Sequence, residues 1–350
     1  IFEDSSNNLW IATYNGGLNI LNRETHVFQS FGMNVSQREA LQSNLVYEIF
    51  ESSGGSLWFS SDNGIHTYSS YSKFFKLNTF QPDSSVHPRG VYSLALAKNG
   101  DLWLGLLGGG IALFDPVSQN VVYHMGKLNN IQIQAIIPTG EVLWLSATNH
   151  GLIKYSPKTK TLKTFTFDEN NVFQNMAMDS KGNLWIDQNG ESLLFFDTVK
   201  ESFKAFTADD GLLSEWMVKI FIDSKDRVII GHSSGGITIY DQALNEFRTI
   251  KPHSNGLLSG KIYDIKEDSA GNLFFATLNG LTRFDQKNNT FTNVTKGNGL
   301  ASNTINAVEE DSTGQLWLFS NQSVSKISPD NNVRNYTTND GLPFNLATDH

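Results

Sequence analysis

The sequence contains no cysteine among its 350 residues, which excludes disulfides, thiol chemistry and zinc sites built on cysteine. It also has no apolar run close to the ~18 residues that are needed to span a bilayer. Basic residues never cluster, and the net charge is −9 with a pI near 5.4. These absences disfavour nucleic acid or an anionic membrane surface as the main partner.

Motifs for catalysis and cofactor binding are missing as well. The eight histidines are scattered without H-E-x-x-H or similar metal spacing, and no G-x-S-x-G elbow occurs. The stretch TADDGLL lacks the ligand spacing of a calcium loop. The glycine-rich GLLGGGIALF precedes a predicted strand and not a helix, so it does not predict a phosphate cradle. We therefore predict no catalytic residue, no cofactor and no metal for this chain.

What the sequence does contain is a repeat. The opening stretch SSNNLWIATYNGGLNIL returns seven times, for example as SAGNLFFATLNGLTRF. The aromatic or aliphatic centre of each copy falls at Trp10, Trp58, Trp103, Trp144, Trp185, Ile229, Phe274 and Trp317. The steps between these positions are 48, 45, 41, 41, 44, 45 and 43 residues. A period near 44 that covers the whole chain is typical of a β-propeller.

Each copy reads as four short strands separated by turns. A run such as residues 46–50 or 262–265 is the first strand, and a turn of the type DSAGN follows it. The LWI segment is the second strand, a segment such as LTRFD is the third, and the fourth carries an aromatic, as in residues 203–206 and 291–294. No helical periodicity interrupts this pattern, which indicates an all-β fold of four-stranded antiparallel blades. We expect Trp10 and its counterparts to pack between blades.

The blade count is less determined by the sequence than the fold. Residues 1–350 form one propeller segment of eight repeats, and we prefer seven blades, with eight blades or one repeat from a neighbouring propeller as alternatives. The chain opens with IFED, which reads as the end of a strand, and it has no starting methionine or signal peptide. We expect it to be an excerpt of a longer protein.

The consensus DSxGNLWIxTxxGGL, followed by an aromatic strand and DGLxSN, resembles the regulator-propeller repeat. That repeat builds the periplasmic sensor region of Bacteroides-type hybrid two-component histidine kinases. The resemblance implies an inner-membrane-anchored sensor that binds oligosaccharide fragments of a polysaccharide. It also implies neighbouring propeller and β-sandwich domains in the same chain, a homodimer, and a kinase outside this segment. It implies no catalysis and no nucleic-acid binding by the segment itself.

Residues that break the repeat in the loops are the candidates for ligand binding. Copies five, six and eight depart from the consensus with WIDQNGES, RVII and FSNQSVSK. Six of the seven tryptophans occupy the repeat position, and Trp216 alone lies elsewhere, just ahead of a first strand. An indole in a loop suits stacking on a sugar ring. The alternative is that Trp216 packs against an adjacent domain or loop.

Polar residues in neighbouring loops complete the predicted site. His232 and His150 follow second strands in copies six and four, while Arg38, His87 and Arg89 fall in loops between blades. Turns after second strands and loops between blades open onto one face of a propeller. Arginine on that face would hold a carboxylate or sulfate, and the other side chains would hold hydroxyls. For each residue alone, a solvated loop position is the competing interpretation.

Two other functions remain open at this stage. A propeller enzyme such as a lyase or lactonase would need His, Glu or Asp converging from first strands, where Glu48, Ser93, Asn175, Lys219 and Asp264 are mixed in type. A pure scaffold would support signalling geometry while the ligand binds elsewhere. We predict a carbohydrate-sensing propeller over both.

Overall fold

The computed structural model describes most of the chain. The described residues are 1–13, 16–32, 41, 43–52, 55–69, 74–78, 91–97, 99–106, 110–115, 120–124, 128, 131–168, 172–188, 190, 192–213, 216–253, 256–321, 323–337, 340 and 342.

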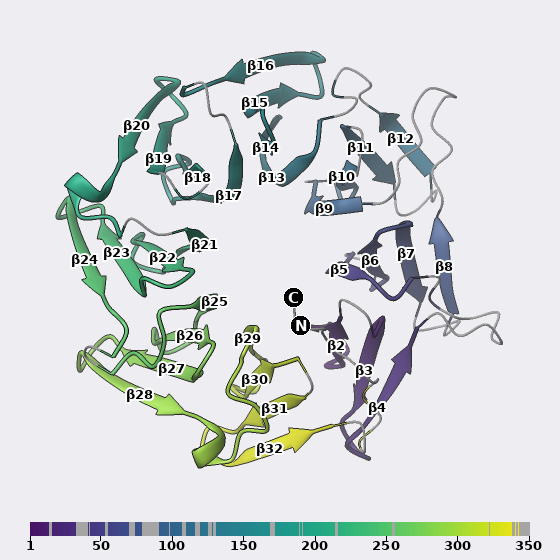
Figure 1. Cartoon of the computed structure of the whole chain (residues 1–350). Helices are drawn as coiled ribbons and strands as arrows, with labels where there is room; N and C mark the ends of the chain where they lie inside the picture. Colours follow the sequence, from purple (N-terminus) through teal and green to yellow (C-terminus); the bar gives the residue numbers. More distant parts are fainter. Residues whose placement is uncertain are drawn as a thin grey trace. The chain divides into compact units, whose positions relative to one another are not determined.

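The described strands form eight four-stranded antiparallel sheets, the blades of a β-propeller, each with its strands in chain order (Figure 1). The prediction of an all-β propeller is therefore confirmed, and the count is eight blades, the alternative to the preferred seven. Blades 1 to 4 comprise β1 (Phe2–Glu3), β2 (Leu9–Ala12), β3 (Leu18–Asn22) and β4 (Val27–Phe31); β5 (Val46–Glu51), β6 (Leu57–Ser61), β7 (Gly64–Ser69) and β8 (Phe74–Asn78); β9 (Val91–Leu96), β10 (Leu102–Leu106), β11 (Ile111–Asp115) and β12 (Asn120–His124); β13 (Ile133–Thr139), β14 (Val142–Ala147), β15 (Gly151–Ser156) and β16 (Thr161–Phe165). Blades 5 to 8 comprise β17 (Phe173–Met178), β18 (Leu184–Gln188), β19 (Ser192–Asp197) and β20 (Ser202–Phe206); β21 (Met217–Ile222), β22 (Val228–His232), β23 (Ile237–Asp241) and β24 (Glu246–Ile250); β25 (Ile262–Glu267), β26 (Leu273–Thr277), β27 (Gly280–Asp285) and β28 (Thr290–Val294); β29 (Ala307–Glu310), β30 (Leu316–Phe319), β31 (Val324–Ile327) and β32 (Val333–Tyr336).

The chain divides into two compact units, and the boundary falls within β17. The N-terminal unit contains residues 2–174 with 340–350, and the C-terminal unit contains Ile1 with residues 175–339. Each unit has its own buried clusters of hydrophobic side chains. Among the described residues, no helix has the length and hydrophobicity to cross a membrane.

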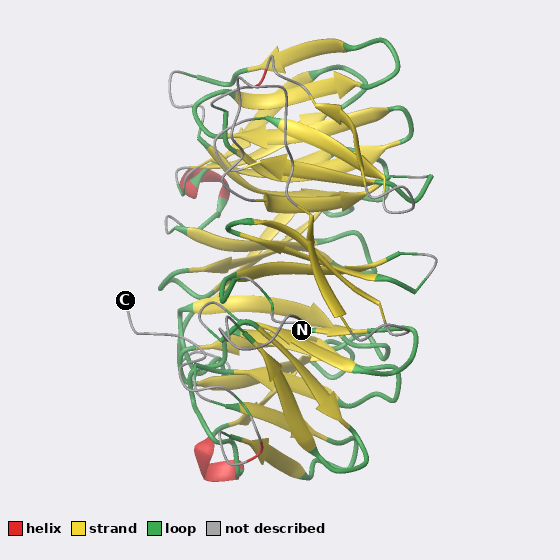
Figure 2. Ribbon diagram, turned by 90° about the vertical axis from the view of Figure 1, so that its right-hand side faces the viewer, coloured by secondary structure: helices red, strands yellow, loops and turns green. Residues whose placement is uncertain are grey.

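Short turns join the strands, and single 3-10 turns follow two of the fourth strands (Figure 2). These are η2 (Ala208–Asp210) and η3 (Lys296–Asn298), and they account for the DGL and NGL stretches of the repeat. In η2 the backbone N–H of Thr207 donates to the Asp210 carboxylate at 2.9 Å, and in η3 Thr295 donates to Asn298 at 3.0 Å. The leucine after each turn is buried, so the motif anchors the connection to the next blade.

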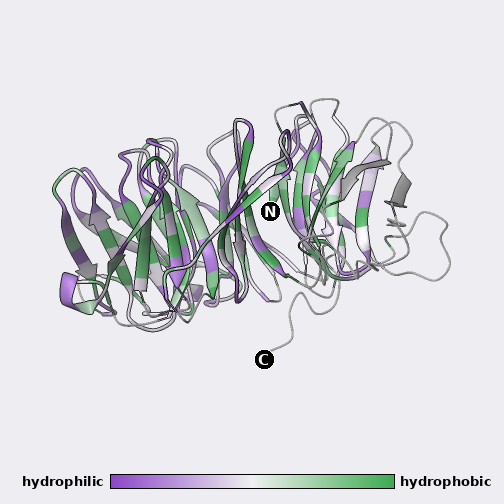
Figure 3. Ribbon diagram, turned by 90° about the horizontal axis from the view of Figure 1, so that it is seen from above, coloured by the Kyte–Doolittle hydropathy of each residue, from purple (hydrophilic) through white to green (hydrophobic). Residues whose placement is uncertain are grey.

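Hydrophobic side chains concentrate along the strands, whereas the turns are hydrophilic (Figure 3). The second strand of every blade carries most of the core, and the pattern in β6, β10, β18, β22 and β26 is buried throughout. Because strands two and three are covered on both sides, they read as apolar runs in the sequence and not as alternating patterns.

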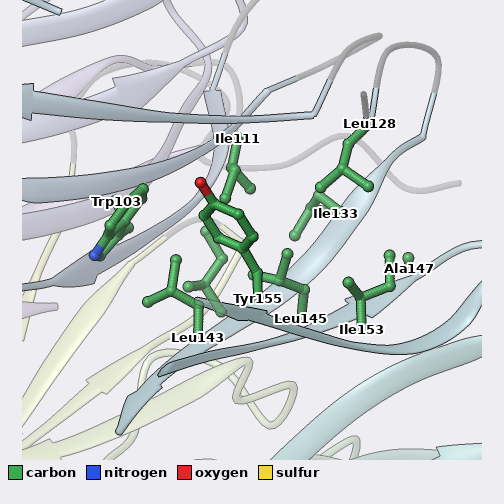
Figure 4. Packing of buried hydrophobic residues seen from close by; sticks show 10 residues of the cluster. Trp103, Ile111, Leu128, Ile133, Leu143, Leu145, Ala147, Ile153 and Tyr155 are labelled. Atoms are coloured by element: carbon green, nitrogen blue, oxygen red, sulfur yellow. The ribbon is translucent and has the colours of Figure 1, made fainter. Parts of the chain in front are cut away.

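The tryptophans of the repeat pack between blades, as the sequence predicts. Trp10 is fully buried, with its ring centroid 4.9 Å from that of Tyr68 and 5.7 Å from that of Phe59, both in blade 2. Trp103 of blade 3 meets Tyr155 of blade 4 edge-on, within a cluster that also holds Leu143 and Leu145 (Figure 4). Aromatic pairs in such geometries stabilise by about 0.5–1.5 kcal/mol beyond burial of their area.

Candidate functional site

Turns after second strands lie beside the loops that lead into first strands. In the N-terminal unit the backbone N–H of Gly17 donates to the carbonyl oxygen of Asn44 at 3.0 Å. In the C-terminal unit Gly236 donates to Gly260 at 3.1 Å, and Ser233 donates to the carbonyl oxygen of Trp216 at 2.8 Å. Within each unit these two kinds of loop therefore meet at one end of the blades. This is the arrangement that the sequence predicted for the ligand-binding face.

Trp216 lies in that set of loops, immediately before β21, and 55% of its surface is exposed. Its indole rests on Gly190, in the turn between β18 and β19 of the preceding blade. A Cβ atom at Gly190 would lie 3.0 Å from ring atom Cδ2 and 3.1 Å from Cε3, and the residue has a φ of +79°. Both facts require glycine there. The indole is thus held on one side and open to solvent on the other.

Beneath Gly190 lies a buried carboxyl group, that of Asp187 at the end of β18. Its Oδ1 accepts a hydrogen bond from the Gly190 N–H at 2.9 Å, and its Oδ2 accepts one from Asn175 Nδ2 at 3.3 Å. Its side chain is fully buried, and this burial raises the pKa of Asp187 to about 6 despite the two hydrogen bonds. Asp187 therefore fixes the turn that supports the Trp216 indole.

The sequence analysis did not single out Asp187, although a signal was present. It occupies the residue two places after the central tryptophan, where six other copies have a small side chain. Those residues are Ala12, Ser60, Gly105, Ser146, Gly231 and Ala276, and Phe319 is the other exception. A carboxylate at a position that is otherwise small and buried breaks the repeat as clearly as Trp216 does.

His232 is not in an exposed turn, which corrects the sequence-based placement. It is the last residue of β22, and its side chain is fully buried. Its Nε2 lies 2.9 Å from the hydroxyl of Thr238 in β23. The neighbouring strand covers the imidazole because the second strand extends one residue further than its apolar pattern. The histidine is therefore closed off from the loop surface on which Trp216 lies.

His150 lies in the N-terminal unit, in the turn between β14 and β15, and is exposed. Its Nδ1 is 2.9 Å from the carbonyl oxygen of Thr148, so Nδ1 carries a proton and Nε2 is left as an acceptor in the neutral ring. The side chain borders an open hollow of about 680 Å³. The other residues that line this hollow are Leu128, Ile131, Ile153, Lys160, Thr161, Leu162 and Thr164.

The remaining predicted site residues cannot be placed. Arg38, His87 and Arg89 lie outside the described residues, and their role in binding stays a prediction. Trp216 and His232 belong to the C-terminal unit, whereas His150 belongs to the N-terminal unit. Within the described part of the chain, no three His, Asp or Glu side chains gather closely enough to hold a metal ion.

Comparison with known proteins places the fold. No protein-family model matches the chain, and no curated protein matches it either. Among solved structures, it resembles the extracellular domain assigned to the hybrid two-component system BT3049 from B. thetaiotaomicron, with 22% identity and a TM-score of 0.59. The match covers 98% of this chain and 52% of that one, so the chain spans about half the length of that domain.

Proteins with other roles share the architecture. Virginiamycin B lyase from Staphylococcus aureus matches with 11% identity and a TM-score of 0.54, over 71% of this chain and 84% of that one. The computationally designed protein Ika8 matches with 11% identity and a TM-score of 0.65, over 95% and 94%. A sensor domain, an enzyme and a designed protein thus have one fold, and function must be argued from the site. What the comparisons establish is an eight-bladed propeller architecture.

Proposed function

We propose that the chain is the ligand-sensing propeller of an extracytoplasmic, membrane-anchored two-component signalling protein. Its ligand would be an oligosaccharide released from a polysaccharide. The observation that carries the proposal is the open indole of Trp216, fixed on the turn that contains Gly190. The resemblance of the repeat to sensor propellers and the similarity in fold to an extracellular sensor domain support it.

The chemistry of the platform fits a sugar. A pyranose ring has a face of C–H groups that packs on an indole, while its hydroxyls need donors and acceptors around the rim. A large aromatic side chain that is more than half exposed in a loop is characteristic of recognition surfaces and not of a core. The Ser233 N–H bond to the Trp216 carbonyl and the contact with Gly190 preorganise the indole, which lowers the entropic cost of binding.

Binding would become a signal through the parts of the sensor that flank this chain. We expect a neighbouring propeller, a β-sandwich and a second protomer, which together would adopt different arrangements with and without ligand. A ligand shifts such an equilibrium only by its difference in affinity for the two arrangements. The propeller would then act in the periplasm as a rigid binding element.

Calorimetric titration tests the proposal directly. The chain would be titrated with oligosaccharides from xylan, arabinan, galactan and chondroitin sulfate digests. We expect heat with one class, and a loss of affinity of about tenfold or more on Trp216→Ala, since an aromatic stacking contact contributes roughly 1–3 kcal/mol. Leu244→Ala is the matched control, because Leu244 is also an exposed apolar residue in a turn. Equal affinity of the Trp216→Ala variant and the unaltered chain would contradict the Trp216 site.

Two results would redirect the assignment. Shortened or unsaturated products on incubation with a polysaccharide would identify a propeller enzyme, which the shared fold with a lyase makes worth testing. Heat with the complete extracytoplasmic region, but none with this chain, would make the chain a scaffold for a site elsewhere.

A further inference from the structure

A pair of tyrosines lies on adjacent first strands of the N-terminal unit. Tyr47 is the second residue of β5, and Tyr92 is the second residue of β9. Their ring centroids are 5.9 Å apart, with 41° between the ring planes, and 37% of Tyr92 is exposed. Two rings from neighbouring blades thus form one aromatic surface at the edge of the sheets.

The propeller repeat does not require an aromatic side chain at this position. Blade 6 has Val218 there, and blade 8 has Asn306. Blade 7 does have a tyrosine, Tyr263, but the ammonium group of Lys261 lies 4.9 Å from the centre of its ring. The tyrosines of blades 2 and 3 are therefore not explained by blade packing.

A carboxylate adjoins the tyrosine pair. Glu48 follows Tyr47 in β5, and its Oε2 accepts a hydrogen bond of 2.6 Å from the backbone N–H of Leu94 in β9. The backbone N–H of Glu48 donates to Ser60 Oγ at 3.0 Å, which fixes the strand at this point. Among the described residues, none donates to the second carboxylate oxygen, Oε1. Glu48 is in contact with solvent, yet burial by its surroundings raises its pKa to about 7 despite the bond from Leu94.

The combination matches the needs of a sugar. An aromatic surface covers the C–H face of a pyranose, and a carboxylate oxygen accepts hydrogen bonds from adjacent ring hydroxyls. Binding sites generally join an apolar lining to a few fixed polar groups, and a perturbed carboxyl beside them is a common companion. We propose that Tyr47, Tyr92 and Glu48 form a saccharide subsite on blades 2 and 3 that takes a neutral pyranose ring. This proposal rests on the proposed function for the class of ligand, but on different residues.

Nuclear magnetic resonance on the intact chain, with ring-labelled tyrosine and labelled indole, tests the subsite. The probes are the methyl glycosides of galactose, glucose, xylose and arabinose. We expect the Tyr92 ring resonance, assigned with Tyr92→Phe, to shift on addition of one glycoside. Tyr92→Ala would weaken binding about fivefold, and Glu48→Gln would weaken it about threefold because the amide accepts more weakly. Tyr263→Ala, at the same strand position in blade 7, would leave affinity unchanged.

The outcomes separate this proposal from the one that rests on Trp216. A shift of the Trp216 indole without any change at Tyr92 would reject the subsite and keep the proposed function. A shift at Tyr92 that survives Trp216→Ala would support the subsite, whether or not Trp216 binds. Equal losses on Tyr92→Ala and Tyr263→Ala, or no tyrosine shift with any glycoside, would overturn the subsite. Thermal unfolding of each variant shows that it is folded before affinities are compared.

Discussion

A carboxylate in the turn after a first strand accepts the indole N–H of the repeat tryptophan. Asp4 bonds Trp10 Nε1 at 2.7 Å, and Asp311 bonds Trp317 Nε1 at 2.8 Å. The same carboxylates accept backbone N–H groups of their own turns, for example from Asn8 at 2.8 Å and Gln315 at 3.0 Å. One residue thus closes a turn and satisfies a buried donor at the seam between blades, which explains why aspartate recurs with tryptophan six residues later.

Blade 2 lacks this aspartate, and the consequence predicts a stabilising substitution. Ser52 stands in its place, and Trp58 Nε1 is buried without a hydrogen-bond partner among the described residues. An unsatisfied buried donor costs about 1–3 kcal/mol. We expect Ser52→Asp to raise the free energy of unfolding by about 1 kcal/mol in urea titrations. The gain should vanish in a Trp58→Phe background, and its persistence there would show that the indole N–H is not the cause.

The buried carboxyl of Asp187 predicts a pH-dependent stability. In the unfolded chain the group titrates near 3.8, and in the folded protein its pKa is about 6. The folded state therefore binds more protons between these values, so the free energy of unfolding falls as the pH rises from about 4 to about 6. Above that window the loss levels off at about 3 kcal/mol, from roughly two pKa units.

Asp187→Asn removes this titration while keeping the shape of the side chain. The variant should gain stability over the unaltered protein as the pH rises through the window, and urea titrations at about pH 4, 5, 6 and 7 would measure the difference. Asp209→Asn, at an exposed carboxylate in η2, is the control and should show no such trend. A constant difference between Asp187→Asn and the unaltered protein at all four pH values would contradict the buried titration.

Adjacent blades are joined by a recurrent contact between a turn and a strand end. The serine after the turn aspartate donates its backbone N–H, and in addition its hydroxyl, to a glutamate at the end of the first strand of the next blade. The backbone distances are 2.7 Å for Ser5 to Glu51, 2.7 Å for Ser224 to Glu267 and 2.8 Å for Ser269 to Glu310. Blade 6 ends its first strand with Ile222, and Ser180 of blade 5 donates instead to Asp226 at 2.8 Å. The link therefore persists when its usual acceptor is absent.

Removing one such acceptor should have a small but measurable effect. Glu267→Ala leaves two donors of Ser224 without their protein partner, but the site is exposed and water replaces the bonds. We expect a loss of about 0.5–1 kcal/mol in the free energy of unfolding. Glu246→Ala, in the outer strand β24, serves as the comparison because it is exposed and has no such contact. A loss above about 2 kcal/mol would mean that the contact is essential to blade docking.

At the scale of the whole molecule, ligand binding and folding are linked. A ligand that binds only the folded chain stabilises it by about 2.7 kcal/mol at a concentration 100 times the dissociation constant. We therefore expect an active oligosaccharide to raise the unfolding temperature in a concentration-dependent way, and Trp216→Ala to abolish the rise at the same ligand concentration. Differential scanning calorimetry measures both. A rise that is unchanged in the variant would place the ligand away from the indole.

The repeat made much of this molecule readable from its sequence. A central tryptophan at steps of 41 to 48 residues predicts four-stranded blades, because only strands of that length between turns can bury a side chain at a constant place. The first strands predicted at residues 46–50 and 262–265 are found as β5 and β25, and the fourth strands at 203–206 and 291–294 as β20 and β28. The same logic predicted that Trp10 is a seam residue and not a binding platform.

Tertiary structure decided the features that depend on which neighbour covers a side chain. His232 reads as a loop residue in the sequence, but Thr238 of the adjacent strand encloses it. Trp216 reads as an outlier, and only the close approach of Gly190 shows how it is held. Tyr47 and Tyr92 stand 45 residues apart and become one surface because β5 and β9 are first strands of neighbouring blades. Local sequence determines strands and turns through backbone preferences, whereas burial and pairing across blades depend on contacts between residues that are distant in the chain.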